Sequence, residues 1–229
     1  MSKFITLISK DNFKGNKNTF FNDSSEIFSS NLETRKIKIK TKNLQCLIVG
    51  YPDDLEREFV DNEFHTIVID GNPFIGRKAI TAQKISEEIL VKGLDKFFSL
   101  IDGAFSIFIY DKKIFKYYFI RDCLGLKNLY YSSRIHNGIN FFVFASTAGA
   151  ILRSSLIKSE YDIDSIARYA ICNYRTVYRN DNSFFKSIKQ LGPSKYIEVN
   201  NDQLSIIEYT NLFKNIEYFE NKNIEDVAK

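Results

Sequence analysis

The sequence predicts an α+β fold in which antiparallel strands precede and follow one long helix. Short runs of apolar and β-branched residues recur between turn residues, as they do in a sheet. One long segment instead spaces its apolar residues as a helix does, and the runs do not alternate with helices in the βαβ order of a parallel sheet. With 229 residues, 44% hydrophobic and 26% charged, the chain has the composition of an ordinary globular protein.

Four runs in the first part of the chain have the composition of strands. The turn residues that punctuate them include Pro52-Asp53-Asp54 and Asp70-Gly71-Asn72-Pro73. Residues 11–30 are rich in Asn, Ser, Lys and Phe without clear periodicity, which indicates a loop with room for a helical turn. The predicted strands are Ile5–Ser9, Arg35–Lys42, Leu44–Tyr51 and His65–Asp70.

The long helix is predicted over Lys84–Leu100, where the apolar residues fall on one face. After it, Asp111-Lys112-Lys113 is a short polar connection between two strand-like runs, which predicts a hairpin. The hairpin strands are Phe105–Tyr110 and Ile114–Ile120; helices are predicted at Ala148–Arg153 and Asp162–Tyr169, and further strands at Ser194–Val199 and Leu204–Tyr209. Residues 212–229, rich in Asn, Glu and Lys, are predicted to be a tail or linker.

Charge gives little indication of a partner. The formal net charge of +4 is small for this length. The one basic concentration, Arg35–Lys42, places its lysines on one face of a strand and Ile37 and Ile39 on the other. Lysines on an edge strand discourage pairing with other sheets, so we interpret this segment as a solvated edge rather than a nucleic-acid surface.

No feature of the chain predicts a membrane or metal protein. The longest apolar runs, Phe105–Tyr110 and Phe141–Ala145, are much shorter than the roughly 20 residues that cross a bilayer. The N-terminal segment lacks the pattern of a secretory signal. Cys46, Cys123 and Cys172 are odd in number and widely spaced, which favours reduced thiols and fits no zinc site. We therefore expect a cytoplasmic protein without a metal.

The most specific motif is an ordered series of short matches in the second half of the chain. Residues 121–131 read R-D-C-L-G-L-K-N-L-Y-Y, follow Asp102-Gly103-Ala104-Phe105, and precede Phe144-Ala145-Ser146. This order resembles the glutaminase domain of asparagine synthetases, a class II glutamine amidotransferase. The resemblance is strongest over Leu94–Arg153 and resumes at Asp162–Asn200.

The resemblance implies a fold and a structural role for the motif. The family fold is the N-terminal nucleophile hydrolase-like αββα sandwich, two antiparallel sheets flanked by helices. In it, residues 1–211 would form a degenerate glutaminase-like domain, and residues 212–229 would lead toward a synthetase domain. Gly125 would permit an unusual backbone angle in a structural, non-catalytic turn. The residues of this turn are Arg121, Asp122, Gly125 and Tyr130.

At the positions where the family carries its catalytic groups, this chain has other residues. Ser2 stands at the nucleophile position, where the family has a cysteine whose thiolate is far more nucleophilic than a hydroxyl. Asp70, before Gly71, stands at the oxyanion position, where an ionised carboxylate can only accept and a donor is needed. Thr81 stands at the amine-clamp position, and Thr147 replaces a glutamate.

The arginine that clamps the substrate carboxylate in the family has no counterpart in Leu44–Tyr51. Arg77, Glu87 or Glu88 could supply the missing charges only if the preceding loop followed another path. We therefore expect no catalytic residue, and no enzyme activity from this chain alone.

The favoured interpretation is an inactive glutaminase-like domain with a structural or substrate-positioning role. Its parent would be an asparagine synthetase-related, ATP-dependent amide-forming system, as in β-lactam synthetases and lasso-peptide cyclases. The chain contains no S-G-G-x-D-S loop, so it would need no cofactor itself, and ATP and Mg would belong to an associated synthetase domain or subunit. A homo-oligomer is the other partner considered.

Two other functions remain open from the sequence. One is a Ser2-dependent N-terminal hydrolase that acts on an amide other than glutamine, which requires removal of Met1. The other is a free-standing ligand- or protein-binding module that keeps only the sandwich.

Overall fold

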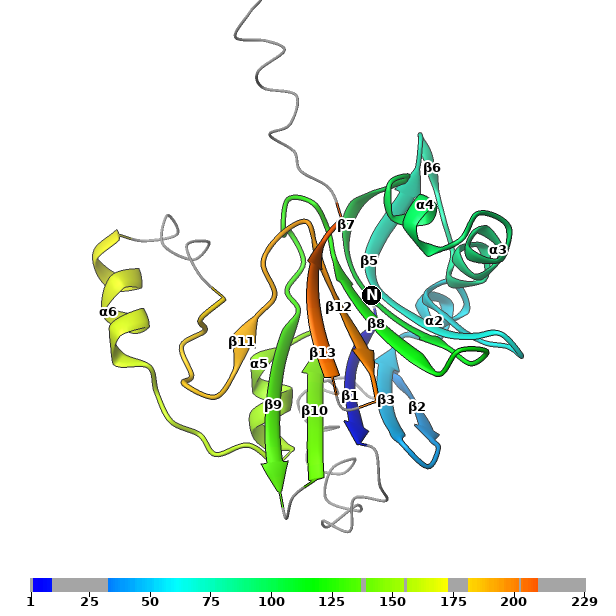
Figure 1. The fold of residues 1–229 in the computed structure, drawn as a ribbon. Helices are drawn as coiled ribbons and strands as arrows, with labels where there is room; N and C mark the ends of the chain where they lie inside the picture. The colour runs from blue at the N-terminus through cyan, green and yellow to red at the C-terminus, as the bar shows by residue number, and fades with distance from the viewer. Residues whose placement is uncertain are drawn as a thin grey trace, which may run out of the picture.

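Two antiparallel sheets lie face to face in the computed structural model, and helices cover their outer sides (Figure 1). The structure describes residues 2–9, 33–136, 139–154, 156–172, 181–201 and 203–209. The predicted αββα sandwich is confirmed. The loop predicted at 11–30 and the tail predicted at 212–229 lie outside the described residues.

The first sheet has the strand order β11-β9-β10-β1-β3-β2. Its strands are β1 (Lys3–Ser9), β2 (Arg35–Lys40), β3 (Leu44–Gly50), β9 (Tyr130–His136), β10 (Ile139–Ala145) and β11 (Lys189–Gln190). β1 pairs with β10 on one side and β3 on the other, so the N-terminus begins inside the sheet. β2 forms one edge and its lysines are exposed, as predicted.

The second sheet has the order β13-β12-β8-β7-β5-β4, and β6 pairs with β5. Its strands are β4 (Phe59–Asp61), β5 (His65–Ile75), β6 (Lys78–Ala79), β7 (Ile101–Asp111), β8 (Lys116–Arg121), β12 (Lys195–Asn200) and β13 (Gln203–Glu208). β7 and β8 are the predicted hairpin; β7 extends beyond its predicted run at both ends, whereas β8 begins at Lys116 and not at Ile114.

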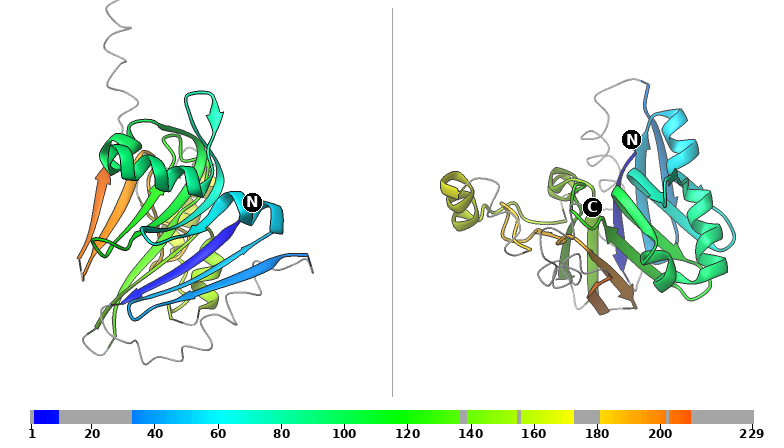
Figure 2. Two further views of the ribbon diagram at one scale, coloured as in Figure 1. Left: turned by 90° about the vertical axis from the view of Figure 1, so that its right-hand side faces the viewer. Right: turned by 90° about the horizontal axis from the view of Figure 1, so that it is seen from above.

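The main core lies between the sheets and is rich in aromatic side chains. Phe119 of the second sheet stacks on Phe144 of the first with ring centroids 3.6 Å apart. Helices α3 (Ala82–Lys92) and α4 (Leu94–Phe98) bury their apolar sides against the second sheet. Helix α5 (Ala148–Arg153) packs against the first sheet (Figure 2).

Several predicted boundaries were wrong. The turn expected at Asp70–Pro73 lies inside β5, because β5 and β7 stay paired through these residues. Gly71 permits this: its φ is +128°, and a Cβ there would lie 2.1 Å from the Ala104 carbonyl oxygen. The expected single helix is divided at Gly93 into α3 and α4.

Other elements were missed. The segment expected as a turn at Pro52 begins helix α2 (Pro52–Glu58), with proline in its first turn followed by Asp53 and Asp54. Strands β4, β9 and β10 were not predicted either. Helix α6 (Ile163–Cys172) was predicted, yet none of its residues is buried, and it extends away from the sheets in Figures 1 and 2. Within the described residues, no helix is both long and apolar enough to cross a membrane.

Candidate functional site at the start of β1

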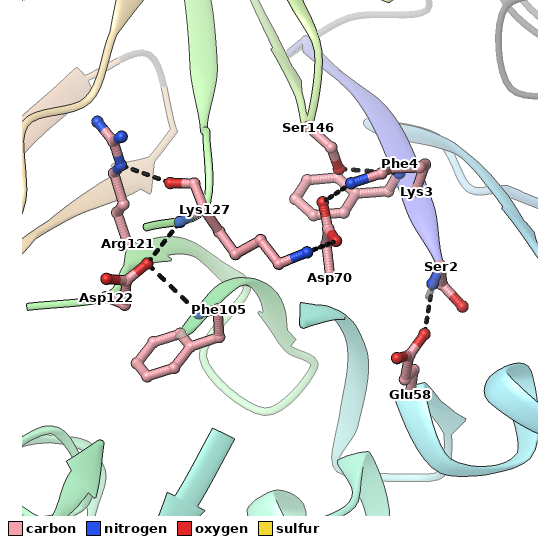
Figure 3. Close-up of polar contacts among 10 residues, drawn as sticks. All are labelled: Ser2, Lys3, Phe4, Glu58, Asp70, Phe105, Arg121, Asp122, Lys127 and Ser146. Atoms are coloured by element: carbon pink, nitrogen blue, oxygen red, sulfur yellow. Dashed lines mark hydrogen bonds and ion pairs between the residues drawn. The ribbon is translucent and has the colours of Figure 1, made fainter. Parts of the chain in front are cut away.

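Ser2, at the expected nucleophile position, is completely buried directly before β1. Its backbone N–H donates to a carboxylate oxygen of Glu58, the last residue of α2 (Figure 3). Its hydroxyl is packed over Gly50 of β3, so that a Cβ on Gly50 would lie 2.5 Å from it. The hydroxyl has no hydrogen-bond partner among the described residues. No base among the described residues is therefore positioned to take its proton.

Glu58 is a member of this site that the sequence prediction missed. Only 7% of it is exposed, and burial raises the pKa of its carboxyl, although the hydrogen bond from the Ser2 backbone N–H opposes that rise. The signal that could have found it is the helix start at Pro52, since α2 brings Glu58 beneath Ser2. The site thus presents a carboxylate to the backbone nitrogen of Ser2.

Asp70, at the expected oxyanion position, accepts from two lysines. It is 1% exposed; one carboxylate oxygen lies 2.5 Å from Lys3 Nζ and the other 3.2 Å from Lys127 Nζ. Lys3 belongs to β1 in the first sheet and Asp70 to β5 in the second, so this ionic cluster bridges the two sheets. Figure 3 shows the two ammonium groups directed at Asp70 and the Ser2 hydroxyl pointing away from it.

Thr81 and Thr147 both cap helices. The Thr81 hydroxyl accepts from the backbone N–H of Lys84 at 3.2 Å, and Thr81 is the N-cap of α3. The Thr147 hydroxyl accepts from the Ala150 N–H at 3.4 Å at the start of α5. Neither residue contributes a charge to the site at Ser2.

The three side chains considered as substitutes lie elsewhere. Arg77 is exposed in the turn between β5 and β6. Glu87 pairs with Lys84 at 3.2 Å, and Glu88 pairs with Lys92 at 2.6 Å, both on the surface of α3. The acidic groups are thus used in helical ion pairs of ordinary spacing.

The Arg121 turn is built from hydrogen bonds to the main chain. Arg121 is 2% exposed; its Nε donates to the Lys127 carbonyl and its Nη2 to the Gly125 carbonyl, each at 2.6 Å, and Nη1 donates to the Leu191 carbonyl. Gly125 has φ +66°, which a side chain would strain. Tyr130, which begins β9, is half-buried, and burial raises its pKa.

Asp122 completes this turn as an acceptor for the backbone. Its carboxylate accepts from the N–H groups of Leu124 and Leu126 at 3.1 and 2.9 Å. It also accepts from the N–H groups of Lys127 at 2.9 Å and of Phe105 in β7 at 3.4 Å (Figure 3). Asp122 is fully buried. The turn therefore fixes the path between β8 and β9 and ties it to β7.

Across the part of the chain that the structure describes, no group of three or more His, Cys, Asp or Glu side chains could hold a metal ion. The ionisable groups of the site are instead the Lys3–Asp70–Lys127 cluster and, beside Ser2, Glu58.

Comparison with known proteins points to one family. A family model described as a glutamine amidotransferase domain matches residues 85–210. Among solved structures, the allosteric regulatory enzyme of purine biosynthesis superposes with a TM-score of 0.55 at 11% identity, covering 91% of this chain and 49% of that one. No curated protein sequence matches.

A second solved structure gives the same picture. Glutamine phosphoribosylpyrophosphate amidotransferase from B. subtilis, complexed with ADP and GMP, superposes with a TM-score of 0.50 at 10% identity and with the same coverage, 91% and 49%. At such identities the likeness concerns the fold alone. The chain spans about half the length of both structures.

Proposed function

Because the chain belongs to the glutamine amidotransferase domain family, we propose that it is a catalytically inactive member with a structural or substrate-positioning role. The system it serves would be an ATP-dependent, amide-forming one related to asparagine synthetase. ATP and Mg would then be bound by the synthetase part, and this chain would hold no cofactor of its own.

The observation that carries this proposal is the ionic cluster around Asp70. Acyl transfer needs hydrogen-bond donors aimed at the oxygen that becomes negative, and loss of one donor typically costs about 10²–10³ in rate. Here a buried carboxylate stands at that position, and both its oxygens are bound by the ammonium groups of Lys3 and Lys127. Lys3 and Lys127 therefore neutralise the Asp70 carboxylate and are not free to stabilise the oxygen that becomes negative during acyl transfer.

The surroundings of Ser2 support the same conclusion. An N-terminal nucleophile uses its own amino group as the base. If Met1 is removed, the amino group of Ser2 would lie at Glu58, which accepts from the Ser2 nitrogen. An adjacent carboxylate favours the protonated form of an amine, which cannot act as a base. With Met1 present, the Ser2 hydroxyl is also fully buried and closed to a substrate amide.

Helix α6 supports a docking role. Its side chains that line a cavity against the sandwich are Ser165, Arg168 and Tyr169, all on one face of the helix. The opposite face is apolar and open to solvent, with Ile163 67% and Ile171 82% exposed. A helix that turns its apolar side outward leaves that side for another surface. We assign that surface to the synthetase domain or subunit.

A glutaminase assay tests the inactivity. Ammonia and glutamate would be measured after incubation with glutamine for the wild type, Ser2→Ala and Ser2→Cys. All three should match the blank, because Ser2→Cys supplies a thiol but leaves Asp70 and Thr81 in place. Turnover by the wild type that disappears in Ser2→Ala would overturn the proposal and favour a serine-dependent hydrolase.

A separate experiment tests whether a synthetase part binds this chain through α6. A coding sequence with an S-G-G-x-D-S loop, either in frame after Lys229 or in a neighbouring gene, would identify the synthetase part. The purified synthetase part should bind the wild type and bind an Ile163→Asp, Ile171→Asp double variant at least tenfold more weakly. Equal binding by both proteins would remove α6 from the interface.

A further inference from the structure

A cavity of about 290 Å³ lies between helix α6 and the end of the first sheet, separate from Ser2 and Asp70. Its walls come from α6, from Tyr130 at the start of β9, from the segment 182–185, and from Gln190 of β11. A cavity of about 150 Å³ is enough to hold benzene. The space under α6 can therefore hold an aromatic ring together with a short polar substituent.

Arg168 lines this cavity without a hydrogen bond or ion pair to any residue that the structure describes, although its charge also acts on the Asp162 carboxylate. Asp162, at the start of α6, has its carboxylate engaged by the Ser165 N–H at 3.1 Å and the Ser165 hydroxyl at 2.9 Å. The guanidinium group therefore keeps its five donors for a ligand, and a planar carboxylate is the group that matches its fork.

The amide side chains of Gln190 and Asn128 also line the cavity, and each has one polar group that no described residue binds and that is free to bind a ligand. Gln190 Nε2 donates to Asn128 Oδ1 at 2.8 Å, and Arg121 Nη2 donates to the same oxygen at 3.4 Å. This pairing fixes both amides and links them to the Arg121 turn. Gln190 Oε1 and Asn128 Nδ2 have no hydrogen bond within the described residues, so one acceptor and one donor remain.

Four aromatic side chains form much of the remaining wall, together with the polar residues Ser165, Asn182 and Ser183. Tyr169 of α6 and Phe184 meet edge to face with ring centroids 5.2 Å apart, and Tyr130 and Phe185 also line the cavity. A lining that combines aromatic side chains with polar groups and one charge is found in small-molecule sites. The rings here offer faces and edges to another ring of similar size.

We propose that this cavity binds an aromatic monocarboxylate, with the carboxylate on Arg168 and the ring between Tyr169, Phe184 and Tyr130. Gln190 and Asn128 would hydrogen-bond a polar substituent of the ring. The site uses none of the residues of the Ser2–Asp70 region, so it does not depend on the proposed inactivity. It would give a domain without glutaminase chemistry a ligand of its own.

Nuclear magnetic resonance titration of the ¹⁵N-labelled full chain tests the site, with phenylacetate as the probe. We expect saturable shifts confined to residues around the cavity, with a dissociation constant at or below about 10 mM, as suits so small a ligand. Phenylacetamide has the same shape without the charge and should bind at least tenfold more weakly. Acetate, which lacks the ring, should also bind more weakly.

Two variants test whether the charge of Arg168 binds the carboxylate of the probe. Arg168→Gln should weaken phenylacetate at least tenfold and leave phenylacetamide unchanged. Arg35→Gln is the matched control, because it removes the same charge from β2 at the opposite edge of the first sheet, where Arg35 is exposed. Thermal unfolding of both variants should match the wild type, since both side chains lie on the surface.

Three results would overturn the proposal. These are the absence of saturable shifts up to about 20 mM phenylacetate, equal affinity for phenylacetate and phenylacetamide, and an equal effect of Arg168→Gln and Arg35→Gln. The last result would mean that the net charge of the protein, and not this cavity, attracts the probe.

Discussion

Two buried aspartates of the same sandwich, Asp122 and Asp70, are neutralised in different ways. Asp122 accepts from backbone N–H groups of its own turn and of β7, so its charge fixes the path of the main chain. Asp70 accepts from the side chains of Lys3 and Lys127, which are partly exposed. The hydrogen bonds of Asp122 thus stabilise the fold, whereas the ion pairs of Asp70 lie at the expected oxyanion position.

The comparison predicts unequal costs of substitution. Removal of a charge held by the backbone leaves buried peptide groups without partners, which is expensive. Removal of a charge held by partly solvated lysines leaves cations that can turn to water, which costs less. The variants below test this order, from the largest expected effect to the smallest.

Arg121→Met should be the most destabilising. It removes donors from three carbonyl groups, those of Gly125, Lys127 and Leu191, in a site where Arg121 is 2% exposed. We expect a loss of about 3–5 kcal/mol in the free energy of unfolding, measured by urea denaturation.

Arg121→Lys serves as the graded control, because it keeps the charge without the fork and should lose less. The exposed Arg35→Gln should change stability by no more than about 0.5 kcal/mol. If Arg121→Met and Arg35→Gln cost the same, the turn does not hold the scaffold.

Asp122→Asn should follow, with a loss of about 2–3 kcal/mol. The amide keeps one acceptor oxygen but points its NH₂ group at backbone N–H donors, which leaves some of them unsatisfied. Hydrogen exchange adds a local readout: amide protection should fall at Leu124, Leu126 and Lys127 first. Unchanged protection at these amides would contradict the role assigned to Asp122.

Asp70→Asn should cost less, about 1–2 kcal/mol, because Lys3 and Lys127 reach solvent. A double-mutant cycle with Lys3→Met isolates the ion pair between the sheets, and a coupling energy of about 1 kcal/mol is expected in urea denaturation. A loss as large as that of Asp122→Asn would mean that the two aspartates contribute equally to stability, and the contrast between them would fail.

The Arg121 turn could be predicted from the sequence better than the Lys3–Asp70–Lys127 cluster, because their hydrogen-bond partners are separated differently along the chain. Most hydrogen-bond partners in the Arg121 turn lie at 122–128 and are neighbours in the chain, so a short motif records the turn, although Leu191 and Phe105 also contribute. Lys3, Asp70 and Lys127 are brought together only by the stacking of two sheets. No spacing in the sequence encodes that approach, and Lys3 and Lys127 were accordingly missed.

The same distinction explains the other errors. The segment at Asp70–Pro73 has the residues of a turn, but pairing with β7 over eleven positions keeps it extended. Helix α6 was predicted from its local pattern, yet the pattern could not show that the apolar side faces away from the sandwich. Residue type sets local preference, and tertiary pairing decides which face is used.

Glu58→Gln should have the smallest effect, and its sign depends on Ser2. Burial raises the pKa of Glu58 above its ordinary value of 4.5. At a pH between these two pKa values, the Glu58 carboxyl is protonated in the folded state and ionised in the unfolded state. The stability that Glu58 contributes is therefore fully present below that ordinary value and is lost as pH rises through the raised pKa. With Met1 retained, Glu58→Gln should stabilise the protein by less than about 1 kcal/mol at pH 7, because the amide still accepts from Ser2 and is never ionised.

Removal of Met1 would reverse that sign, because the freed Ser2 ammonium would pair with the Glu58 carboxylate and the amide could not replace its charge. Urea denaturation between pH 4 and pH 8, combined with the intact mass, separates the two cases. Glu56→Gln, on the exposed side of the same helix, is the control and should leave the pH profile unchanged. A stabilised Glu58→Gln variant in protein that lacks Met1 would show that the carboxylate does not hold the amine, and the argument that Glu58 keeps Ser2 from acting as a base would fall.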